Sequence, residues 1–133
     1  MSQALIKRAF ESALEVYAGE KGIPVAYPGI AFDPPAGMYL ACYALPALTD
    51  SLALGGDHRL YSGVFQINIV FPAGDGTGDG DEVAQELANH FPLNATFGDV
   101  GVQVMTPVSV VAPIISGGLI SIPASFSYRL DTN

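Results

Sequence analysis

The stretch from Leu60 to Phe91 constrains the fold of this 133-residue chain more than any other part of it. Its first twelve residues alternate between two faces, and one face carries Tyr61, Phe65, Ile67, Ile69 and Phe71, with Gly63 as the only gap. A period of two in aromatic and β-branched residues indicates a strand with one buried face. Pro72 ends the expected strand, because proline has no N–H to donate.

A glycine-rich acidic loop and an amphipathic helix follow this strand. The loop reads AGDGTGDG over residues 73–80, too rich in glycine for either helix or strand. From Asp81 the period becomes helical, with an apolar stripe of Val83, Ala84, Leu87, Ala88 and Phe91 that Pro92 closes. We expect Asp79 to cap this helix and Glu82 to complete a capping box.

The N-terminal part of the chain predicts a helix, an extended edge segment and a strand. Ser2 is the expected N-cap of a helix whose apolar residues recur every three or four positions and which ends at Gly19 or Gly22. The proline-rich stretch Ile23–Pro35 fits an extended segment along a sheet edge. Met38–Leu45 is apolar on both faces and predicts a second strand.

The C-terminal part predicts further strands. The first are a short extended piece at Leu93–Phe97 and a half-buried strand over Val100–Val104. An apolar segment, Val108–Ile115, is interrupted at Pro113. A turn at Gly117-Gly118 leads into a last strand over Ile120–Leu130. The last strand alternates clearly, with Ser121, Ser125 and Ser127 on its polar face. Pro123 predicts that this strand lies at an edge or contains a bulge.

Two helices with one apolar stripe each and several strands with one apolar face each indicate an α+β fold. We expect a mostly antiparallel sheet with both helices packed on one face, in one domain spanning residues 1–133. The second face of the sheet would be lined with Ser, Gln and Asn. Such a surface suits either water or a neighbouring subunit.

Composition argues against two classes of partner. Thirteen acidic and five basic residues give a net charge of −8, which disfavours direct binding to nucleic acid. No run approaches the ~18 consecutive apolar residues that a membrane span needs, so we expect no membrane segment. Cys42 is the single cysteine, which excludes an intramolecular disulfide.

The acidic loop matches a calcium-binding pattern. Its candidate ligands follow the spacing of an EF-hand loop and are Asp75, Thr77, Asp79, Asp81 and Glu86. Two features oppose this interpretation: Glu82 occupies a position that should be apolar, and a strand enters the loop where an EF-hand has a helix. We therefore favour a structural turn and expect no cofactor, with a calcium-binding module kept as an alternative.

No arrangement of residues indicates catalysis. His58 and His90 are distant in sequence, and neither stands in a metal-ligand spacing with Cys42. No Ser-His-Asp or Cys-His order accompanies a recognisable nucleophile elbow. Cys42 lies in an apolar strand and is expected to be an inert core thiol. We therefore do not expect an enzyme.

An ordered series of motifs resembles the tail terminator proteins of tailed bacteriophages. The series comprises an N-terminal helix with Phe10, I-P-V-x-Y-P at Ile23–Pro28, D-P-P at Asp33–Pro35, M-Y-L at Met38–Leu40, Y-S-G-V-F-Q-I-N-I at Tyr61–Ile69, and a glycine-rich loop opening a helix that ends at Phe91. The resemblance runs from about Ile6 to Phe91 and, more loosely, through the last strand. The acidity of the loop at Gly74–Asp81 is a departure from the family.

The resemblance implies a structural virion protein that acts by assembly. Such proteins form a ring, usually of six subunits, on the end of the tail tube, stop its polymerisation and offer a surface for joining the head. The implied partners are other copies of the chain, the tail tube protein and a head-completion or neck protein. The implied location is the virion tail, assembled in the host cytoplasm. A different neck or head–tail completion protein is the alternative.

The resemblance implies regions of contact with other proteins and implies no catalytic residues. The candidate contacts lie in the long connection between the second and third predicted elements of the sheet and on the polar face of the last strand: Thr49, Leu52, Leu54, His58, Arg59, Ser121, Ser125 and Ser127. The connection Ala47–Arg59 carries leucines that do not obviously reach the core, so we expect it to order against a neighbouring subunit. Deleting Ser51–Asp57 is expected to leave the fold nearly intact and to abolish the ring.

Overall fold

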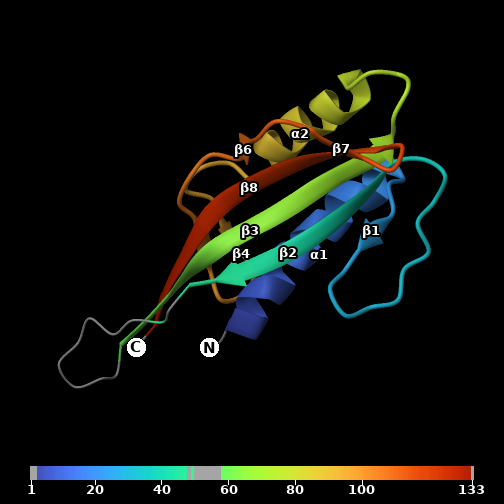
Figure 1. Ribbon diagram of the computed structural model, residues 1–133. Helices are drawn as coiled ribbons and strands as arrows, with labels where there is room; N and C mark the ends of the chain where they lie inside the picture. Colours follow the sequence, from blue (N-terminus) through green and yellow to red (C-terminus); the bar gives the residue numbers. More distant parts are fainter. Residues whose placement is uncertain (1–2, 48, 50–57, 133) are drawn as a thin grey trace.

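The computed structural model describes residues 3–47, 49 and 58–132. These residues form an α+β fold in which two helices cover one face of a curled, mostly antiparallel sheet (Figure 1). The elements in chain order are α1 (Gln3–Lys21), β1 (Val25–Ala26), β2 (Tyr39–Pro46), β3 (Arg59–Pro72), α2 (Gly78–His90), β4 (Thr96–Phe97), β5 (Val102–Val104), β6 (Ser109–Val110), β7 (Ile114–Ser116) and β8 (Leu119–Thr132). Within the described ranges, no helix is both long and apolar enough to cross a lipid bilayer.

The sheet is built around the pairing of β3 with β8. These two strands pair antiparallel over fourteen positions, from Arg59 opposite Thr132 to Pro72 opposite Leu119. The strand order is β1-β2-β3-β8-β5-β4, and β6 and β7 also pair with β8. Among the strands of the described residues, only β1 runs parallel to its neighbour, β2. The expectation of an extended edge segment over Ile23–Pro35 is confirmed only at β1, and residues 27–35 are outside the sheet.

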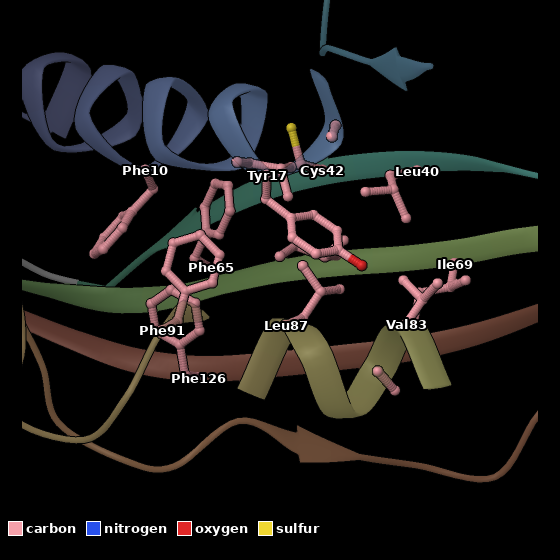
Figure 2. Close-up of a cluster of buried hydrophobic side chains, with 14 of the residues drawn as sticks. Phe10, Tyr17, Leu40, Cys42, Phe65, Ile69, Val83, Leu87, Phe91 and Phe126 are labelled. Atoms are coloured by element: carbon pink, nitrogen blue, oxygen red, sulfur yellow. The ribbon is translucent and has the colours of Figure 1, made fainter. Parts of the chain in front are cut away.

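The core lies between the helices and one face of the sheet. Figure 2 shows side chains from α1, α2, β2, β3 and β8 meeting in one layer. Phe10 of α1 is at its centre, with ring centroids 5.1 Å from Phe126 and 5.3 Å from Phe65. Phe91, just after α2, stacks on Phe126 at 5.0 Å. The apolar stripes and alternations of the sequence therefore mark the faces that are buried.

Gly63, the one gap in the buried face of β3, accommodates a ring from the neighbouring strand. A Cβ atom there would lie 2.5 Å from the hydroxyl oxygen of Tyr128. That hydroxyl donates to Oε1 of Gln3 at 2.7 Å, and Nε2 of Gln3 donates to the carbonyl of Ser62 at 3.2 Å. The start of α1 is thus hydrogen-bonded to both central strands.

The start of α2 differs from the prediction. The helix begins at Gly78 after Thr77, and the Thr77 side chain makes no capping hydrogen bond. The Thr77 hydroxyl instead donates to Oδ2 of Asp81 at 2.9 Å. Asp79 lies inside the first turn, so the predicted Asp79 cap and its Glu82 capping box are wrong. Gly80 explains the earlier start, because it is buried against the Phe71 ring and fixes the first turn on the sheet.

The prediction for Pro123 is also wrong, because β8 is neither an edge strand nor bulged there. β8 has β3 on one side and β5, β6 and β7 on the other, and Pro123 stands opposite Asn68 in an unbroken register. The residue falls between the segments of β8 that pair with β6 and β7. Its carbonyl accepts from the N–H of Val111 at 3.2 Å, so its missing N–H faces the break between those strands.

The hairpin from β7 to β8 has the predicted turn at Gly117-Gly118. Both glycines have positive φ, 59° and 79°, and Ser116 pairs with Leu119 across them. Two left-handed residues in succession are the geometry of a type I′ hairpin turn, which favours glycine.

Candidate subunit interface

The sheet face opposite the helices carries a polar central stripe. In the register of β3 and β8, Ser125 stands opposite Gln66. Along the open face of β8, Ser127 lies two residues after Ser125 and Ser121 lies four residues before it. The side chain of Gln66 donates to Oδ1 of Asn68 at 2.9 Å. The three predicted serines are therefore brought together with the Gln and Asn of β3, as the alternation indicates.

The flank of this face is apolar. Tyr43 and Leu45 of β2 are both exposed and stand opposite Gln66 and Val64. On the other side, exposed Ile114 of β7 stands opposite Ser121. The expectation of a second face lined with Ser, Gln and Asn thus holds in part, because β3 alternates Gln66 and Asn68 with Val64 and Val70 on this face. The signal that pointed to the β2 flank was the apolar character of Met38–Leu45 on both of its faces.

A charged cluster lies at the far end of β3 and β8. Nε2 of His58 lies 3.2 Å from Oδ1 of Asp131, and Nε of Arg129 lies 2.9 Å from Oδ2 of the same carboxylate. The guanidinium of Arg59 donates to the carbonyl of His58 at 2.9 Å. The hydrogen bond from Arg129, and secondly the nearby positive charge, lower the pKa of Asp131.

Of the other predicted contacts, Thr49 is exposed. Leu52 and Leu54 lie outside the described residues. The role predicted for the connection between β2 and β3 therefore stays a prediction. Asp131 was not singled out from the sequence, although the alternation that places Ser125 and Ser127 on the open face extends to it.

Comparison with known proteins decides the family. The family model described as phage tail terminator protein matches residues 5–128. The chain belongs to the phage tail terminator family. Members of this family are structural tail proteins, not enzymes, which gives the chain a tail-associated structural role.

Two solved structures are similar to this chain. One is 41% identical in sequence, and the match covers 100% of this chain and 98% of the other with a TM-score of 0.84. A second, from a structure titled "Virion of native gene transfer agent (GTA) particle", is 15% identical, covers 98% of this chain and 97% of that chain, and has a TM-score of 0.64. At that identity the second likeness shows a shared fold. No functionally curated protein matches the chain significantly.

The acidic loop of this tail terminator does not gather its predicted calcium ligands. Asp75, Asp79 and Asp81 are exposed, and Asp81 accepts from Thr77. Glu86 instead faces α1: its Oε1 accepts from the Tyr17 hydroxyl at 2.7 Å, and its Oε2 lies 3.1 Å from Nζ of Lys21. In the part of the chain that the structure describes, no three His, Cys, Asp or Glu residues form a group that could hold a metal ion.

The two helices are held together by polar contacts that the sequence did not indicate. Hydrogen bonds from Tyr17 and Lys21 lower the pKa of Glu86, whereas burial, followed by the bond to Glu86, raises that of Tyr17. Nε2 of His90 lies 2.7 Å from the carbonyl oxygen of Ala13. His90 was placed at the end of a helix by the sequence, but its contact with α1 depends on the packing of the helices.

Cys42 is buried in β2, as expected for a core thiol. Burial, the largest cause, raises the pKa of the thiol to about 12. The thiol is therefore protonated at neutral pH and is a poor nucleophile.

Proposed function

We propose that this protein closes into a ring on the end of the completed tail tube, stops further tube polymerisation and presents the surface that joins the head. The observation that carries the proposal is the family match over residues 5–128, which takes in α2, all but the first two residues of α1 and nearly all of the sheet. The proposed ring has six subunits. Its proposed partners are the tail tube protein on one side and a head-completion or neck protein on the other, with assembly in the host cytoplasm.

The open sheet face supports a role in assembly. Its stripe of Ser121, Ser125 and Ser127 carries no charge, and exposed Tyr43 and Leu45 lie on the same face, on the far side of β3. Contact through uncharged groups suits a chain of net charge −8, because like charges brought together at an interface cost free energy. We assign this face to contact with a neighbouring subunit or with the tube.

Tube length tests the proposal. Tail tubes assembled without this protein are expected to exceed their normal length and to fail to join heads, because nothing halts the addition of tube subunits. Negative-stain electron microscopy gives the length distribution with and without the protein. Adding back the purified chain should restore the normal length.

Two outcomes would count against termination. Tubes that keep their normal length without the protein would show that another component stops polymerisation. If those tubes of normal length also failed to join heads, the protein would belong to the neck instead.

A further inference from the structure

The edge of the sheet formed by β6, β7 and the start of β8 exposes an unusual amount of apolar surface. Every residue from Ser109 to Leu119 is exposed. The large apolar side chains of this segment, which we call the apolar edge, are Val110, Val111, Ile114, Ile115 and Leu119. Ile115 is the most exposed at 72%, and Val111 and Ile114 are each 57% exposed. Clustered apolar exposure of this kind marks an interaction site.

The apolar edge has two sides. Ile114 stands opposite Ser121 and so belongs to the open face of the sheet, whereas Ile115 stands opposite buried Ile120 and belongs to the helix-covered face. A flat partner could cover only one of these sides. A partner that buries both must be concave.

Charge favours another copy of this chain as the partner. From Met105 to Tyr128 the sequence contains no Asp, Glu, Lys, Arg or His. Two copies of a chain with net charge −8 repel each other, and they approach at lowest cost where neither carries charge. A basic partner would gain more from the acidic surfaces elsewhere on the molecule.

The chain also carries a concave apolar surface. A groove of about 500 Å³ runs between α1 and the connection from β4 to β5, and we call it the α1 groove. Its apolar lining is Leu5, Ala9, Ala13, Val16, Phe97 and Val100, and Arg8 and Asp99 contribute one charge of each sign. Gly98 forms part of its wall: its φ is +70°, and a Cβ atom there would lie 2.6 Å from Cβ of Ala9.

A subunit cannot fill its own α1 groove with its own apolar edge. Val104, which follows the groove-lining connection, pairs with Tyr128, and Ile115 pairs with Ile120. Those two positions are eight residues, or about 26 Å, apart along β8. Figure 1 likewise shows the β7 hairpin and the start of α1 toward opposite ends of the sheet.

We propose that the apolar edge of one copy inserts into the α1 groove of the next copy, and that this pairing is the subunit contact of the ring put forward under Proposed function. The two surfaces are different, so the contact is head-to-tail. A head-to-tail contact repeats around a circle and closes when its rotation is a whole fraction of a turn. Apart from the part around Ile114, the open sheet face then remains available to the tube.

A mixing experiment tests the pairing. Ile115→Glu disables the edge and leaves the groove intact, whereas Val16→Glu disables the groove and leaves the edge intact. Each variant alone is expected to sediment as a monomer under conditions where the unaltered chain forms rings. An equimolar mixture is expected to contain dimers and no rings, because only one intact contact can form. Ile30→Glu, which alters a residue that is 66% exposed outside both surfaces, should still form rings.

Cross-linking provides a second measurement in a chain that carries no added charge. The double variant Ile115→Cys and Val16→Cys, under mild oxidation, is expected to give a ladder of covalent multimers. Each single cysteine variant should stay monomeric on a denaturing gel. Native Cys42 does not interfere, because it is buried.

The outcomes separate this inference from the proposed function. Rings that persist in both glutamate variants, or the absence of a cross-linked ladder, would overturn the pairing and leave the ring standing. Rings of the unaltered chain combined with no dimer in the mixture would also overturn it. Dimers of Val16→Glu alone would overturn it too, because they would point to a contact of the edge with itself. An unaltered chain that stays monomeric would overturn self-pairing, while tube length would still decide termination.

Discussion

At the scale of single residues, the packing is very tight where α2 meets the sheet. Gly80 is buried in the first turn of α2. A Cβ atom there would overlap the Phe71 ring, lying 2.8 Å from its Cζ, and would lie 2.9 Å from Cδ1 of Ile122. Gly78, two residues earlier, has nothing within 4 Å of the same position. The two glycines therefore differ in packing although they share one helical turn.

Gly80→Ala is expected to lower the free energy of unfolding by about 1–3 kcal/mol, because the added methyl group overpacks the contact with Phe71. Gly78→Ala is the matched control and should leave stability unchanged or raise it by up to about 1 kcal/mol, because alanine restricts the unfolded chain and favours helix. Urea denaturation of the two variants measures the difference. Equal destabilisation by both would show that α2 is held to the sheet less tightly than this geometry indicates.

At the scale of elements, the contact between α1 and α2 depends on pH. Tyr17 and Lys21 of α1 both hydrogen-bond the carboxylate of Glu86 on α2 and lower its pKa from the ordinary 4.5. A carboxyl group with a lowered pKa in the folded state binds protons more weakly there than in the unfolded chain. Its stabilising contribution is therefore present above about pH 4.5 and is lost as the pH falls through the lowered folded-state value.

Glu86→Gln should accordingly lower the melting temperature at neutral pH and have a smaller effect in acid. At low pH the native carboxyl is protonated and resembles the amide that replaces it. Thermal melts of both proteins across the acid range measure the change, and Glu20→Gln, on the exposed side of α1, serves as the control. A difference that stays constant with pH would show that the Glu86 contribution is not electrostatic.

At the scale of the whole molecule, net charge and apolar surface act in opposite directions on assembly. Copies with a net charge of −8 repel one another, whereas the apolar edge carries no charge and the α1 groove contains Arg8 and Asp99, which cancel. Association is therefore expected to strengthen when salt screens the repulsion.

Sedimentation velocity at two salt concentrations measures this effect. Raising the ionic strength from about 0.01 M to about 0.15 M shortens the Debye length from about 30 Å to about 8 Å. The ring fraction should rise over this range at constant protein concentration. A fall would instead indicate ion pairs across the interface, for which the cluster of His58, Arg129 and Asp131 would be the first candidate.

The sequence by itself determined which residues face the core. The alternation over residues 61–71 and 120–130 and the stripes of the two helices are local consequences of the strand and helix periods, so one buried face per element could be assigned without knowing its partner. The same reasoning placed Ser121, Ser125 and Ser127 together on the open face. Proline and glycine marked β1 at the edge and the turn at Gly117-Gly118, because their backbone restrictions are also local.

Only the tertiary structure decided what meets across the sequence. The packing of the Phe71 ring against Gly80 set where α2 starts. The hydrogen bond from Tyr17 to Glu86, 69 residues away, gave that carboxylate a role other than a metal ligand. The break between β6 and β7 accommodated Pro123 inside the sheet. An apolar run such as Val108–Ile115 has the same periodicity whether it is buried or exposed, since burial depends on the elements that pack over it. In this fold no described element covers Val110–Ile115, and that exposure is what directs the proposed assembly.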